Sequence, residues 1–226
     1  MVAKMIAAAL MAATFATAAN AEDREERSID GKFTTIEVSK GANLSIVQGE
    51  RVGIEVVTDG CPTSDVETGL SNGQLTVKMK KRTPGSAVQV LVYLSDLEKV
   101  TVRRGASVET DGTFTRKGKF TLDVGAKCEA KMDIDVDELN VDASTCRIEI
   151  EGRANKQNVF IAGTLGGAMY DAKELVSETV NIKSVNADAV VKFDGKLNAE
   201  AVSCTIKYIG DSNNVTKSGN GGVEPM

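Results

Sequence analysis

Three aspartates alternate along one short stretch of the chain, and their spacing comes closest to a catalytic arrangement. Asp133, Asp135 and Asp137 lie in the sequence MDIDVDE. In an extended strand, residues two apart share one face and lie roughly 7 Å from each other. That separation is compatible with the paired carboxylates of an inverting glycosidase. A solvated strand face has the same alternation, and we favour that interpretation. A Ca²⁺ ion on the acidic ladder is the other alternative, but no D-x-D-x-D-G loop supports it.

The rest of the composition offers little catalytic chemistry. Histidine is absent, which removes the commonest general base, the commonest metal ligand and the usual partner of a Ser or Cys nucleophile. The chain has no Trp and only 3 Tyr, so few side chains are available to stack on a sugar ring. The glycines of Gly163–Gly167 have no Lys after them and indicate a turn rather than a phosphate loop. We therefore expect no catalytic residues, no metal and no cofactor.

A turn of small residues followed by an alternating strand recurs through the chain. The clearest copy is Asp142–Gly152, with the sequence DASTCRIEIEG. Aligning the copies on their turns gives steps of 17 to 22 residues. Self-similarity at such a period is typical of a solenoid, in which a single coil cannot bury its apolar face alone. The expected turn anchors are Gly105, Gly125, Ser144, Gly163, Val185, Val202 and Gly219.

Apolar and polar residues alternate along most of the chain from Phe33 onward. A period of two indicates half-buried strands, and Asn72-Gly73 predicts a hairpin turn between two of them. We predict an all-β fold, a parallel β-helix or solenoid with coils of about 20 residues, stacked about 4.8 Å apart. A β-sandwich is the alternative, but it offers no reason for one turn to recur at this spacing.

Four cysteines, Cys61, Cys128, Cys146 and Cys204, form an even set that invites disulfides in an exported protein. Cys146 and Cys204 share a column but lie three coils apart, at roughly 14 Å, which exceeds the ~7 Å limit between bridged Cα atoms. A Cys128–Cys146 bridge would join neighbouring coils, although an offset of one position turns Cys128 toward the other face. We favour the alternative that Cys128, Cys146 and Cys204 are small buried residues at tight turns.

The first 21 residues have the pattern of a secretory signal peptide. Lys4 supplies the positive charge, Met5–Ala19 forms the apolar region, and a small-x-small site predicts cleavage before Glu22. A short membrane anchor is the alternative, but a spanning helix needs roughly 20 apolar residues. No later apolar run is long enough to span a bilayer.

After cleavage we expect a charged, solvated leader over residues 22–30 and a single domain over residues 31–223. The net charge of −5 argues against a nucleic-acid partner and against adsorption to anionic membranes, since both depend on Lys and Arg. The basic segment Lys80–Gly85 is interpreted as a solvated loop.

Several motifs along the chain together resemble a known family. They are F-x-x-I-x-V at Phe33–Val38, Leu97 with Val100 and Gly105-Ala106, the turn Ala143–Ile148, and Ile206–Gly210 followed by Ser218–Gly221. The pattern resembles the putative auto-transporter adhesin, head GIN domain family over about residues 31–223. The resemblance implies an exported, right-handed β-helix of repeats with an adhesin-like role and no catalytic residues. The glycine-rich triplets of the family's turns are replaced here by STC, TLG, NAD and SCT, and no translocator barrel or sorting tail is evident.

These observations favour an exported, non-enzymatic structural or binding module. Its repetitive β surface would face a protein or glycan at the cell envelope, in the periplasm or on the cell surface. The alternative is a carbohydrate-active enzyme, a glycoside hydrolase or lyase, that uses the carboxylates of Asp133–Asp137. Self-association into a homo-oligomer is a further hypothesis, because the unpaired edges of an open coil stack template pairing.

Overall fold

The computed structural model describes residues 22–164 and 168–226. The predicted signal peptide, Met1–Ala21, and residues 165–167 of the glycine turn lie outside the described residues. Within these residues the structure contains two single-turn 3-10 helices, η1 (Thr63–Asp65) and η2 (Ser212–Asn214). The strands of the described residues are β1 (Asp23–Arg27), β2 (Thr35–Ser39), β3 (Asn43–Gln48), β4 (Gly53–Asp59), β5 (Val66–Ser71), β6 (Gln74–Met79), β7 (Ala87–Leu94), β8 (Lys99–Val102), β9 (Ser107–Asp111), β10 (Phe114–Val124), β11 (Glu129–Ser144), β12 (Arg147–Ala162), β13 (Met169–Val185), β14 (Asp188–Val202), β15 (Thr205–Ile209), β16 (Val215–Gly219) and β17 (Gly222–Pro225).

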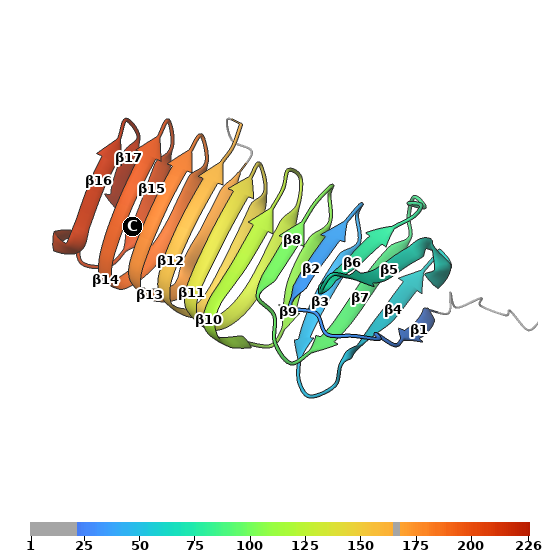
Figure 1. The fold of residues 1–226 in the computed structure, drawn as a ribbon. Coiled ribbons are helices and arrows are strands. Elements are labelled where there is room, and N and C mark those ends of the chain that lie inside the picture. Colours follow the sequence, from blue (N-terminus) through green and yellow to red (C-terminus); the bar gives the residue numbers. More distant parts are fainter. Residues whose placement is uncertain (1–21, 165–167) are drawn as a thin grey trace, which may run out of the picture.

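The strands stack side by side into an elongated solenoid (Figure 1). The long strands β10–β14 each pair in parallel with the next one along the chain. The shorter β15, β16 and β17 complete the stack at the C-terminal end. The solenoid has about 7 turns, with coils of about 19 residues. The prediction of an all-β solenoid is confirmed, and the chain does not form the alternative β-sandwich.

Columns of aliphatic side chains make up the core. Parallel pairing in register places equivalent positions of successive coils on top of one another. One such column, buried throughout, consists of Val100, Leu122, Val141, Val159 and Ile182. Branched aliphatic side chains pack well in such columns on a pleated surface, and burying each one contributes about 1.5–3 kcal/mol. A narrow core of this kind needs few aromatic residues.

The N-terminal part of the stack departs from the regular repeat. β2 lies between β6 and β8, so the order of coils in space differs from their order in the sequence. β4 pairs antiparallel with both β7 and β1. β5 and β6 form an antiparallel hairpin whose turn is Asn72-Gly73, with φ of 50° and 73°. The predicted hairpin is therefore confirmed, although its antiparallel surroundings were not expected.

The charged segment after the predicted cleavage site forms an edge strand, and its side chains are exposed or half-exposed. β1 pairs with the edge of β4 over its whole length. Arg24 donates to Glu55 at 2.8 Å, and Arg27 donates to the Val66 carbonyl at 2.8 Å. An edge strand is held mainly by backbone hydrogen bonds and does not require alternating apolar side chains. The charged sequence of β1 therefore gave no pattern from which a strand could be predicted.

The turns at one edge of the stack contain a residue in the left-handed backbone region. These residues, with φ between 47° and 61°, are Lys40, Arg104, Lys127, Thr145, Asn186 and Ser203. Their recurrence shows that one tight turn is reused coil after coil, with charged side chains at the N-terminal end and uncharged ones toward the C-terminus.

The pairing register locates the expected turn anchors. Ser144 and Val185 both lie opposite Ala162, and Val185 lies opposite Val202. Gly125 follows Val124, which pairs with Ala143, so it occupies the position of Ser144. The other three are displaced. Gly163 follows Ala162, Gly219 lies opposite Ala201 rather than Val202, and Gly105 lies two residues beyond Arg103. Because the turns differ in length, the seven predicted anchors do not all lie at the same position of the coil.

Candidate functional site

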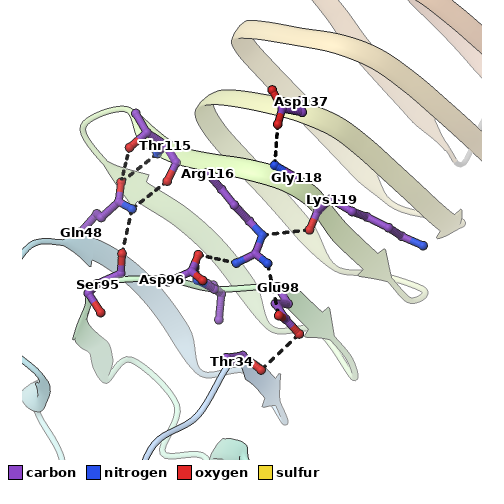
Figure 2. Close-up of polar contacts among 11 residues, drawn as sticks. Thr34, Gln48, Ser95, Asp96, Glu98, Thr115, Arg116, Gly118, Lys119 and Asp137 are labelled. Carbon is purple, nitrogen blue, oxygen red and sulfur yellow. Dashed lines mark hydrogen bonds and ion pairs between the residues drawn. The ribbon is translucent and has the colours of Figure 1, made fainter.

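The three alternating aspartates lie on an outer face of β11, and two of them are bonded to the preceding coil. Asp133 Oδ2 accepts a hydrogen bond from Thr113 Oγ1 at 2.6 Å. Asp137 Oδ2 accepts one from the Gly118 backbone N–H at 2.7 Å (Figure 2). Asp135 is exposed. Two of the three carboxylates thus brace neighbouring coils. Within residues 22–164 and 168–226, no group of three or more Cys, Asp or Glu residues is arranged to hold a metal ion.

Arg116 ties the long strands to the N-terminal part of the molecule (Figure 2). Its side chain is only 13% exposed and forms ion pairs with Asp96 and, at 3.2 Å, with Glu98. Its Nε donates to the Lys119 carbonyl at 3.0 Å. The guanidinium of Arg116 therefore donates to three acceptors at once, which its planar arrangement of N–H groups allows. No motif around Arg116 predicts this role from the sequence.

Gln48 closes the same junction beside Arg116 (Figure 2). Its amide nitrogen donates to the carbonyls of Thr115 at 2.8 Å and Ser95 at 3.0 Å. Its Oε1 accepts from the Thr115 backbone N–H at 2.8 Å. These hydrogen bonds join the end of β3 and the connection between β7 and β8 to the start of β10. We therefore assign the cluster of Arg116 and Gln48 a structural role.

Cys128 and Cys146 lie at equivalent positions of neighbouring coils. Glu129 pairs with Arg147 in register, so the residues before them also lie opposite each other. The expected offset of Cys128 is wrong, because the longer turn after β10 absorbs the extra residue. All four cysteines are free thiols in the structure. Burial raises the pKa of the Cys146 thiol to about 11, and the neighbouring Cys128 adds to this effect. The Cys146 thiol is therefore protonated at neutral pH.

A ladder of asparagines crosses the outer face of β11–β14. Asn140, Asn158, Asn181 and Asn198 occupy the same position of four successive coils. The Nδ2 atom of each later residue donates to the Oδ1 atom of the one before it, at 2.9, 3.0 and 2.7 Å. Glu138 Oε1 accepts from both Asn140 and Asn158 at 3.1 Å. This carboxylate starts the ladder and orients all four amides in the same direction.

The ladder forms the floor of a groove of about 520 Å³, which we call the asparagine groove. Phe160 is 42% exposed and presents an aromatic ring beside the ladder. Lys183 Nζ pairs with Glu200 at 2.8 Å one strand further on. Thr121 and Thr216 lie in the ladder's column beyond its two ends. The column next to the ladder consists of Asp142, Phe160, Lys183, Glu200 and Ser218.

The amides of the groove keep hydrogen-bonding capacity for a ligand. A primary amide has two N–H donors and an oxygen with two lone pairs. In the ladder, Asn181 and Asn198 each use one N–H and thus retain the other. The oxygens of Asn140, Asn158 and Asn181 each accept one ladder bond. The groove therefore offers donors and acceptors in alternation beside an exposed ring.

The asparagine ladder leaves a repeated pattern in the sequence. Each ladder residue begins a similar segment, NVDA at Asn140, NVFIA at Asn158, NIKSV at Asn181 and NAEAV at Asn198. Repeated polar residues at one position of a solenoid coil share a face, so this repeat predicts a stacked column. Aligning the chain on these segments rather than on the small turn residues would have identified it.

Comparison with known proteins now identifies the family. The family described as "Putative auto-transporter adhesin, head GIN domain" matches residues 32–212. The chain belongs to this family. The match confirms the resemblance and includes most of the asparagine groove. Membership of an adhesin family indicates an extracellular or surface protein. In the part of the chain that the structure describes, no helix has the length and apolar character needed to cross a bilayer.

Several solved structures share the fold of this family member. A putative adhesin from Bacteroides fragilis has a TM-score of 0.79 at 14% identity, covering 91% of this chain and 97% of its own. A putative adhesin from Parabacteroides merdae has a TM-score of 0.61 at 19% identity, covering 91% and 96%. A "putative lipid binding protein" from Parabacteroides distasonis has a TM-score of 0.67 at 18% identity, with the same coverage. No curated protein matches the sequence.

Proposed function

We propose that the protein is an exported, non-enzymatic, adhesin-like module that binds a glycan of the cell envelope in its asparagine groove. The observation that carries this proposal is the ladder of four oriented amides beside the exposed ring of Phe160. Membership of an adhesin family supports a binding role. The predicted signal peptide supports export.

The chemistry of the groove favours a neutral glycan. Hydroxyl groups both donate and accept hydrogen bonds, and amides match them in both respects. The flat apolar face of a sugar ring can lie on Phe160, because aromatic rings present a large apolar surface. The nearest charged pair, Lys183 with Glu200, is mutually neutralised at 2.8 Å. Asp142 in the groove wall and Glu138 at the start of the ladder leave an excess of negative charge, which disfavours an anionic ligand.

A glycan array probed with residues 22–226 tests the proposal. We expect binding to a subset of neutral glycans. Phe160→Ala should weaken that binding at least tenfold, because the aromatic platform is lost. Asn181→Ala should also weaken it, because one ladder bond on each side of Asn181 is removed.

Ile209→Ala is the matched control for the Phe160 variant. Ile209 is 37% exposed and lies on β15, outside the groove. Loss of an exposed apolar side chain there should leave glycan binding unchanged. Equal weakening by Phe160→Ala and Ile209→Ala would contradict the proposed site, and an array without any bound glycan would contradict the proposed function.

The non-enzymatic part of the proposal has its own test. The protein is incubated with acidic and neutral polysaccharides, and released reducing ends and unsaturated products are measured. We expect no product above a blank. Product formation that Asp133→Asn and Asp135→Asn abolish would instead support the carbohydrate-active enzyme.

A further inference from the structure

The turns at the N-terminal end of the stack carry a concentration of positive charge. β6, β2, β8 and β10 are consecutive neighbours in space, and the turn after each of them carries at least one cation. These residues, all exposed, are Lys80, Lys81 and Arg82 after β6, Lys40 after β2, Arg104 after β8 and Lys127 after β10. We call this set the turn ridge. The equivalent turns of later coils carry the uncharged Thr145, Asn186 and Ser203.

Contacts between the turns bring these cations together. The guanidinium of Arg82 lies over the Lys40-Gly41 turn, with Nη1 3.7 Å from the position of a Cβ built on Gly41. Lys40 and Lys80 both act on Glu67, whose pKa is lowered mainly by its bond to Lys78. Segments distant in the sequence thus contribute to one patch.

The charge of the ridge is not neutralised within the described residues. The six ridge cations form no ion pair there, whereas neighbouring cations do. Lys78 pairs with Glu67 at 2.9 Å, and Arg103 pairs with Asp123 at 2.5 Å. These two carboxylates are therefore already engaged. A chain with a net charge of −5 nevertheless presents a local cationic edge.

The backbone at the ridge is unfavourable for the residues that it carries. Lys40, Arg104 and Lys127 have φ of 58°, 56° and 61°. This left-handed region costs an ordinary L-residue roughly 1 kcal/mol, and Asn tolerates it better than Lys or Arg does. Packing alone would favour Asn or Gly at these exposed positions. The uncharged Thr145, Asn186 and Ser203 occupy the same backbone region in later turns, so this conformation belongs to the repeated turn and only the charge is particular to the ridge.

We propose that the turn ridge binds an acidic polysaccharide, at a site separate from the asparagine groove. A column of cations about 4.8 Å apart, the spacing between neighbouring strands, suits a linear polymer with regularly repeated anionic groups. Of the exposed large apolar residues of the described chain, Met169 lines a hollow with Lys127 at one end of the ridge, whereas Val52, Phe160, Ile209 and Met226 lie outside it. One methionine offers little apolar surface to insert into a membrane, and the ridge has no aromatic platform of the kind that binds single-stranded nucleic acid.

The test measures binding of residues 22–226 to heparin and polygalacturonate, with dextran as the neutral probe, over a range of salt concentrations. We expect binding to the two acidic polymers only, with an affinity that falls as salt rises. The ridge variant is Lys40→Asn, Arg104→Asn and Lys127→Asn. Asparagine tolerates the left-handed backbone, so this variant should fold at least as well as the parent protein. We expect it to bind at least tenfold more weakly and with a shallower salt dependence.

The matched control removes three exposed cations elsewhere, by Lys156→Gln, Lys196→Gln and Lys207→Gln, with the same change in net charge. It should keep most of the affinity. Equal weakening by both triple variants would overturn the proposal, as would an absence of binding to either acidic polymer. Tighter binding to anionic vesicles or to single-stranded DNA than to the polysaccharides would overturn the assigned partner class. Neutral-glycan binding in the groove should be unaffected by the ridge variant, so the two proposed sites are tested independently.

Discussion

A buried polar group inside the aliphatic core shows how single residues shape this solenoid. Gln157 is fully buried in the inward column between Leu139 and Val180. Its Oε1 accepts from Tyr170 Oη at 2.8 Å, and its Nε2 donates to Ser177 Oγ at 2.7 Å. Buried polar groups are tolerated when they are paired in this way. Burial also raises the pKa of Tyr170, so the phenol remains a donor at all ordinary pH values.

Removing the Tyr170 hydroxyl should destabilise the protein, because the buried Gln157 amide oxygen loses its hydrogen-bond donor. Tyr170→Phe deprives Gln157 Oε1 of its donor inside the core, and we expect a loss of about 1–3 kcal/mol in the free energy of unfolding. Urea denaturation measures this change. Tyr208→Phe is the control, because its hydroxyl bonds to Ser212 at 3.2 Å in a partly exposed position. A loss for Tyr208→Phe as large as that for Tyr170→Phe would contradict this assignment.

At the scale of elements, the critical joint lies between the irregular N-terminal coils and the regular long strands. The connection between β7 and β8, which contains Asp96 and Glu98, lies against the start of β10. This connection follows the antiparallel strands β4–β7 and leads into the regular parallel coils. Arg116 and Gln48 supply the hydrogen bonds that backbone pairing does not provide there. The joint is therefore held by side-chain hydrogen bonds, whereas the later coils are held by backbone hydrogen bonds between paired strands.

Arg116→Gln should loosen this joint. Loss of two ion pairs and one bond to a carbonyl should lower the free energy of unfolding by about 1–2 kcal/mol, because the arginine is largely buried while its partners are half exposed. Arg116→Lys should recover less than half, since an ammonium lacks the planar fork. Denaturation and hydrogen exchange of residues 95–119 provide the measurements.

Arg153→Gln is the matched control for the joint. Arg153 pairs with Glu178 at 3.4 Å with both side chains more than half exposed, so its loss should cost less than about 0.5 kcal/mol. If Arg153→Gln and Arg116→Gln prove equally costly, the joint has no special role.

For the whole molecule, the N-terminal end of the stack is protected by its own first strand. β1 covers the edge of β4, and an uncovered edge strand invites pairing with other chains. Glu25 supports β1 indirectly, because its carboxylate accepts from Arg27 at 2.8 Å within the strand, and Arg27 in turn donates to the carbonyls of Val66 and Thr63 at 2.8 and 2.9 Å. The bond from Arg27, with a smaller contribution from Thr63, lowers the pKa of Glu25 to about 2 from its usual 4.5.

Acid should therefore weaken the attachment of β1 to the rest of the solenoid. A lowered folded-state pKa contributes stability above the unfolded value, near 4.5, and that contribution is lost as the pH falls toward 2. We expect stability to decline and self-association to rise across this window, as measured by thermal unfolding and light scattering. Glu25→Gln should show a smaller decline between these pH values, and an unchanged profile in that variant would rule out Glu25 as the cause.

Much of the fold was predictable from local pattern. Alternation from Phe33 onward predicts strands, Asn72-Gly73 predicts its hairpin, and turns such as Asp142–Gly152 predict a coil repeat. The candidate groove was harder to predict from the sequence. Its asparagines recur in the sequence, but their hydrogen bonding depends on a register that turns of unequal length control. The candidate aspartates were visible from the sequence, whereas their engagement with Thr113 and Gly118 of the preceding coil was not.

Alternation in the sequence was sufficient to predict most of the strands, because the inward and outward faces of a strand depend only on residues two apart. The three-dimensional fold decides which coils are neighbours. It placed β2 between β6 and β8, brought Cys128 beside Cys146 and gave the charged segment Asp23–Arg27 a partner strand. Parallel pairing joins residues one coil or more apart, and turn lengths and inserted hairpins set that pairing. The groove and the ridge arise at this level, since both consist of side chains that only stacking brings together.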